Sequence, residues 1–121
     1  MARLAPEELM RRVERALQVG GGLYGPADIE ACVEEGRMQA LSYEDSLVVT
    51  EILTSPRRKF MNVALAVGSL EHFEPLQDQL MALGREHGCD AIRMGGRKGW
   101  ASILPRHGWT QLPVINFERR L

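Results

Sequence analysis

The sequence contains few of the features that mark specialised protein classes. Its two cysteines, Cys32 and Cys89, lie far apart and form no CxxC pair, which argues against zinc and for a reducing compartment. No stretch approaches the roughly 20 uninterrupted apolar residues that a membrane span needs. The N-terminal segment has no apolar run followed by a small-residue cleavage site, so we expect no signal peptide. These absences predict a soluble, cytoplasmic protein.

An excess of charge of one sign is also absent. Lys and Arg number 15 against 16 Asp and Glu, the net charge is -1, and 45% of the residues are hydrophobic. Such values are typical of globular proteins, and they exclude a disordered chain, a collagen-like repeat and a strongly basic nucleic-acid coat. The 121 residues show no repeat and no linker, so residues 1–121 are expected to form one domain.

Hydrophobic periodicity predicts two helices followed by three strands. The first helix begins at Pro6 and ends at three consecutive glycines, and the second runs from Pro26 to a cap at Gly36. Three strands should follow, and the short turns between them indicate an antiparallel meander. These strands are expected over residues 37–43, 46–53 and 59–67.

The second half of the chain has a strand–helix–strand pattern. A helix over residues 70–87 leads to a short strand at 91–94, which a right-handed crossover should place parallel to the third strand. A fourth helix is expected over 97–104, and residues 109–121 form a final extended segment. The expected element order is therefore α-α-β-β-β-α-β-α-β.

This order resembles the acyl-CoA N-acyltransferase fold of the GNAT superfamily. FMNVALAVG followed by LEHFEPLQDQLMALGREHGCDAIRM is similar to the family's central strand, CoA-side helix and next strand, and WASILPRHGW resembles its late helix. The resemblance covers residues 6–121 without the family's usual first strand. It implies a compact α+β, GNAT-like fold, with a mixed sheet (antiparallel meander plus strand–helix–strand unit) flanked by about four helices. Small divergent domains of this kind also occur among phage particle and assembly proteins.

The family's pyrophosphate-binding loop is only partly matched. The family pattern is Gln/Arg-x-x-Gly-x-Gly/Ala, whereas this chain has a single glycine there, and Glu71 and Glu74 stand where the pyrophosphate would lie. The resemblance therefore implies a degenerate CoA site. If acetyl-CoA does bind, the residues implied to hold it through their backbone amides are Val67, Gly68 and Ser69.

The family's proton donor is also replaced. Many members carry a Tyr four residues before the glycine of the late helix, but here Leu104 precedes Gly108 by four residues and cannot donate a proton. His107 is a candidate substitute for the acid and Glu51 for the base. The alternative for both is a solvated surface residue. The His and Cys residues show no metal-ligand spacing, so no metal site is expected.

Charge is distributed unevenly along the chain. Residues 26–54 carry one Arg against seven acids, whereas residues 91–121 carry six cations against one Glu. A Gly-Gly-Arg-Lys turn follows the short strand and could hold an anion through its amides and cations, the alternative being a tight turn with solvated charges. A basic surface for an anion or a partner is therefore predicted from Arg57, Arg58, Lys59, Arg97 and Lys98.

Together these observations predict a non-catalytic or weakly catalytic GNAT-like protein of phage type. It would act through protein contacts in virion structure or assembly, with particle components or copies of itself as partners and with no cofactor. One alternative is a divergent acyl-CoA-dependent N-acetyltransferase that uses acetyl-CoA. A second is a small module that binds an anionic partner. No membrane partner is expected, and nucleic acid is less favoured because aromatic residues that could stack on bases are scarce.

Overall fold

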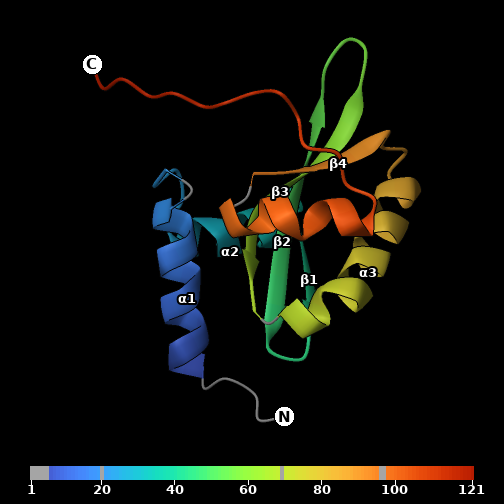
Figure 1. Cartoon of the computed structure of the whole chain (residues 1–121). Coiled ribbons are helices and arrows are strands. Elements are labelled where there is room, and N and C mark those ends of the chain that lie inside the picture. Colours follow the sequence, from blue (N-terminus) through green and yellow to red (C-terminus); the bar gives the residue numbers. More distant parts are fainter. Residues whose placement is uncertain (1–5, 20, 69, 96–97) are drawn as a thin grey trace.

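Figure 1 shows the computed structural model, which describes residues 6–19, 21–68, 70–95 and 98–121. Within these ranges the chain forms three α-helices, four strands and short 3-10 helices. No described helix is long and apolar enough to cross a membrane. The elements are α1 (Pro6–Val19), α2 (Pro26–Glu34), β1 (Met38–Tyr43), β2 (Ser46–Thr54), β3 (Lys59–Val67), α3 (Phe73–Glu86) and β4 (Ala91–Met94), with 3-10 helices at Leu70–His72, Lys98–Ser102 and Leu104–His107.

The four strands form one mixed sheet in the order β1-β2-β3-β4. β1 pairs with β2 and β2 with β3 in antiparallel fashion, and β4 lies parallel to β3 after the α3 crossover. The predicted meander and strand–helix–strand unit are thus confirmed. The compact α+β fold expected from the sequence is the fold observed.

Helices cover both faces of the sheet and bury a core on each (Figure 1). α1 and α2 pack on one face, and α3 packs on the other. Strand residues alternate between the two cores because successive side chains point to opposite faces. The first core contains Val13, Leu17, Ile29, Cys32, Met38, Val49 and Leu65, and the second contains Val48, Met61, Val63, Leu76 and Leu80.

The structure differs from the sequence prediction after β4. The single helix expected over 97–104 is instead two short 3-10 helices, Lys98–Ser102 and Leu104–His107. Gly99, a poor α-helix former, lies within the first of these, and Pro105 lies in the first turn of the second, where proline favours the start of a new helix. Residues 109–121 are extended as expected, but they pair with no strand among the described residues, so the predicted final strand is wrong.

Candidate functional site

β3 and β4 separate before β3 ends. Their parallel pairing runs only from Phe60 opposite Ala91 to Val63 opposite Met94. At the end of β3, residues 65–67 pair with β2 on one side, but none of residues 64–67 pairs with β4 on the other. β3 also contains a bulge, because Leu65 pairs with Val49 and Val63 with Thr50. A gap therefore opens between the end of β3 and the chain that follows β4.

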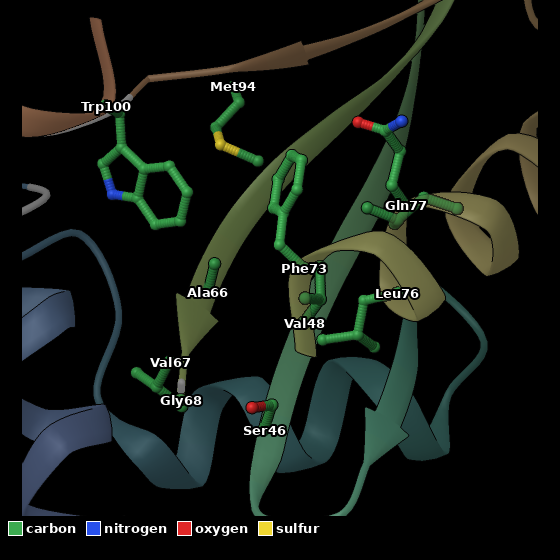
Figure 2. Close-up of a pocket in the computed structure, with 11 residues that line it drawn as sticks. Ser46, Val48, Ala66, Val67, Gly68, Phe73, Leu76, Gln77, Met94 and Trp100 are labelled. Atoms are coloured by element: carbon green, nitrogen blue, oxygen red, sulfur yellow. The ribbon is translucent and has the colours of Figure 1, made fainter. Parts of the chain in front are cut away.

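A pocket with a cavity volume of about 70 Å³ lies at this gap (Figure 2). Its walls are mostly apolar, and they come from β2, β3, α3, the end of β4 and the segment that follows it. On this scale a water molecule needs about 10–15 Å³, so the pocket has room for a group of a few heavy atoms. The lining residues are Ser46, Val48, Ala66, Val67, Gly68, Phe73, Leu76, Gln77, Leu80, Met94 and Trp100.

Aromatic side chains close one side of the pocket. The ring of Phe73 lies 5.8 Å from that of Trp100 and 4.8 Å from that of His107, centroid to centroid. His107 Nδ1 is 3.9 Å from Glu74 Oε1, and the Glu74 side chain is 78% exposed. The structure thus places His107, one of the two catalytic candidates, beside a carboxylate and against Phe73, although His107 does not itself line the pocket.

Glu51, the other catalytic candidate, lies elsewhere. It is half-buried on β2 and accepts a hydrogen bond from Asn62 Nδ2 at 3.2 Å. It alternates with Thr50, so its side chain points to the same face as Val49, which packs against α1 and α2. Glu51 does not line the pocket and is not brought near His107.

The predicted CoA-binding loop lies at the pocket, as far as the structure describes it. Val67 and Gly68 line the pocket, and Ser69 lies outside the described residues. Glu71 and Glu74 are both exposed where the chain enters α3. Their exposure is typical of carboxylates at the positive end of a helix.

The described basic residues of the predicted surface lie in two separate segments of the chain. Arg57 and Arg58 lie in the turn between β2 and β3, and the backbone N–H of Lys59 donates to Asp90 Oδ2 at 3.1 Å. Because β3 and β4 run parallel, Lys59 and Asp90 mark the same end of the sheet, whereas Lys98 follows the other end of β4. Arg97 lies outside the described residues, so the anion-binding surface stays a prediction.

Sequence reasoning missed a buried polar cluster beside the pocket. Ser46 Oγ lies 2.7 Å from His72 Nδ1, and Asp45 Oδ1 lies 3.3 Å from the same nitrogen. The His72 ring also makes an edge contact with Tyr43, at 5.3 Å between ring centroids. Ser46 lines the pocket, so this cluster supports the pocket's polar end. No group of His, Cys, Asp and Glu within the described ranges has the arrangement of a metal site.

Replacing His72 by alanine tests how much this cluster contributes to the free energy of unfolding. The change removes the imidazole that bonds to Ser46 and lies against half-buried Asp45, so we expect the free energy of unfolding to fall by about 1–3 kcal/mol. Urea denaturation measures it. His87→Ala is the matched control, since His87 is exposed at the end of α3 and its loss should change stability by less than about 0.5 kcal/mol. Equal effects of the two substitutions would contradict a structural role for the cluster.

Solved structures share this fold. TTHA1254 from Thermus thermophilus aligns with a TM-score of 0.61 at 15% identity, covering 100% of this chain and 98% of that one. An aminoglycoside acetyltransferase from an uncultured soil metagenomic sample aligns at 0.65 and 16% identity, covering 95% and 89%. A ribosomal-protein-alanine N-acetyltransferase from Brucella melitensis aligns at 0.59 and 13% identity, covering 99% and 98%.

No protein-family model and no curated protein matches the chain. The structural matches show that the chain has a GNAT-like fold. At these identities they show the fold alone. None of these comparisons supports the expected role in phage particle assembly.

Proposed function

We propose that this protein is an acyl-CoA-dependent N-acyltransferase that receives the acetyl group of acetyl-CoA in the pocket between β3 and β4. The observation that carries the proposal is the gap where β3 continues beyond the end of β4, with the apolar pocket in it. A pocket of about 70 Å³ has room for an acetyl group. The acetyltransferase names of several fold neighbours agree with this proposal.

The residues around the pocket fit the acetyl-bearing end of acetyl-CoA. Val48, Ala66 and Leu76 offer apolar contacts to a methyl group. Residues 64–67 of β3 pair with no residue of β4, so their backbone groups on that side can bond to the amides of an extended ligand. Acetyl-CoA would supply an activated thioester, and the protein's task would be to hold it and exclude water from it.

The side chains near the expected position of the acetyl-CoA pyrophosphate are less favourable, because two of them are acidic. Glu71 and Glu74 are exposed near the entry to α3. In bulk water a unit like charge at 4 Å costs only about 1 kcal/mol, and salt reduces this further. The two carboxylates therefore weaken binding of an anionic ligand without blocking the pocket.

His107 is our candidate for moving a proton. Its ring packs on Phe73, which lines the pocket, and Glu74 Oε1 lies 3.9 Å from its Nδ1. A histidine can take a proton from an attacking ammonium group or give one to a departing thiolate at neutral pH. We assign this role to His107 because Leu104, at the position of the usual tyrosine, cannot fill it.

Blocking the pocket tests the proposal. Ala66→Phe places a large side chain where Figure 2 shows only a methyl group on the pocket wall. We expect this variant to bind acetyl-CoA at least 10-fold more weakly than the unchanged protein in calorimetric titration at low salt. The rate of acetyl transfer to a panel of primary amines, measured as the release of free thiol, should fall in parallel.

Ala82→Phe is the matched control, because Ala82 is exposed on α3 and does not line the pocket. This variant should bind acetyl-CoA like the unchanged protein. No detectable heat with the unchanged protein at millimolar acetyl-CoA would overturn the proposal. Binding without release of thiol would leave an acyl-CoA-binding protein and overturn its catalytic part.

A further inference from the structure

Ser46 contacts the chain both where it leaves β3 and where it enters α3. Its Oγ lies 2.7 Å from Nδ1 of His72, the N-cap residue of α3. At the end of β3, the backbone of Gly68 approaches Ser46 so closely that a Cβ on Gly68 would lie 2.6 Å from Ser46 Cα. Figure 2 shows Ser46 and Gly68 side by side at one end of the pocket. One buried serine therefore links the end of β3 to the start of α3.

The turn between β1 and β2 holds the His72 ring from other sides as well. Asp45 Oδ1 lies 3.3 Å from Nδ1, and the Tyr43 ring makes an edge contact at 5.3 Å between centroids. At the opposite edge of the imidazole, Glu71 Oε1 lies 3.7 Å from Nε2. His72 is 8% exposed and Ser46 is 2% exposed, so water cannot readily replace either partner of their hydrogen bond. Losing such a bond is costly, because the remaining buried group is left unpaired.

We infer that Ser46 is a positioning residue for acetyl-CoA, acting through His72. The inference rests on the proposed function, in which the ligand reaches from the pocket toward the entry to α3. Phosphate groups bind to backbone N–H groups at the start of a helix when these groups point at the ligand. Because His72 caps α3, fixing its ring fixes the direction of the first N–H groups of the helix. The exposed carboxylates of Glu71 and Glu74 oppose an anion there, so the binding depends more strongly on these backbone groups.

The expected loss is confined to ligands that carry the pyrophosphate. S-Acetylpantetheine has the same thioester as acetyl-CoA but lacks the pyrophosphate and the nucleotide. In calorimetric titration of the full chain, Ser46→Ala should raise the Kd of acetyl-CoA about 10-fold and that of S-acetylpantetheine less than about 3-fold. In assays of thiol release, the KM for acetyl-CoA should rise with its Kd while kcat stays nearly constant. Ser42→Ala is the matched control, because it removes a hydroxyl from an exposed position on β1 and should change neither Kd.

Two substitutions of His72 separate its hydrogen bond from the bulk of its ring. Asparagine branches at Cγ as histidine does, so an amide oxygen or nitrogen can take the place of Nδ1 opposite Ser46. Glutamine carries the same amide one carbon further along the side chain. His72→Asn should therefore keep the Kd of acetyl-CoA within about 3-fold, whereas His72→Gln should raise it about 10-fold, as Ser46→Ala does. Both variants lose the ring contact with Tyr43, so a difference between them reports the bond to Ser46.

Circular dichroism at the titration temperature shows which variants are folded, and the His72 pair decides the question if Ser46→Ala is not. Equal weakening of both ligands by Ser46→Ala would mean that Ser46 contacts the acetyl end directly, and it would overturn the inference. Unchanged acetyl-CoA binding by folded Ser46→Ala, or equal binding by His72→Asn and His72→Gln, would also overturn it and would leave the acyltransferase proposal standing. If the unchanged protein binds neither ligand, the proposed function itself fails, and the positioning role fails with it.

Discussion

Gly68→Ala is expected to lower the free energy of unfolding by about 2–6 kcal/mol, the largest effect that we predict for a single added methyl group. Gly68 has φ +132°, a conformation that residues with a side chain rarely adopt, and forcing one into it costs about 1–3 kcal/mol. A Cβ there would lie 2.0 Å from Ser46 Oγ and 2.6 Å from Ser46 Cα. Because Ser46 begins β2, relieving this overlap must move backbone, and overpacking of this kind costs about 1–3 kcal/mol more.

Two other glycines separate these causes. Gly36 has φ +78° and a Cβ added to it would have nothing within 4 Å, so Gly36→Ala should show the cost of conformation alone, about 1 kcal/mol. Gly95 has neither a positive φ nor a neighbour within 4 Å, and Gly95→Ala should be close to neutral. Urea denaturation of the three variants gives the ranking. Equal destabilisation by Gly68→Ala and Gly36→Ala would show that the contact with Ser46 is unimportant.

The strands and the crossover could be predicted from the sequence because local signals and global fold agree there. β3 reads as a nearly continuous apolar run, and it is covered on both faces, by α1 on one and α3 on the other. Short turns specify the antiparallel pairs, and a helix between two strands specifies a parallel one. The chain after β4 lacks such agreement. Gly99 and Pro105 interrupt its helical pattern, and the extended segment after Gly108 pairs with no strand among the described residues.

The candidate site was harder to predict from the sequence, because the pairing register of the strands decides which side chains meet there. Whether Glu51 or Thr50 faces α3 is fixed by the β2–β3 pairing, and that pairing shifts at the bulge in β3. Ser46 and His72 are 26 positions apart, and they meet only because β2 begins beside the end of β3. His107 could be named as a candidate from the sequence, because it lies in the segment that resembles the family's late helix. Its contact with Phe73 could not be predicted, because it depends on how the two 3-10 helices pack on α3.

Met61→Ala is expected to lower the free energy of unfolding by about 2–5 kcal/mol, the usual range for truncating a large buried side chain. Met61 is 0% exposed and belongs to the core between β3 and α3. Its terminal methyl lies against α3 at Gly84, where a Cβ would be 3.8 Å away. Gly84 has no side chain that could move into the space left there by truncation.

Met81→Ala provides the comparison on the same helix-covered side of the molecule. Met81 lies on α3 but is 37% exposed, so its truncation removes little buried surface and should cost less than about 1 kcal/mol. Met61→Leu should recover most of the loss, because a swap that keeps the side-chain volume usually costs less than about 1.5 kcal/mol. Thermal and urea unfolding report all three. If Met61→Ala were no more destabilising than Met81→Ala, α3 would not be packed on β3 as described, and the pocket that depends on that packing would lose its wall.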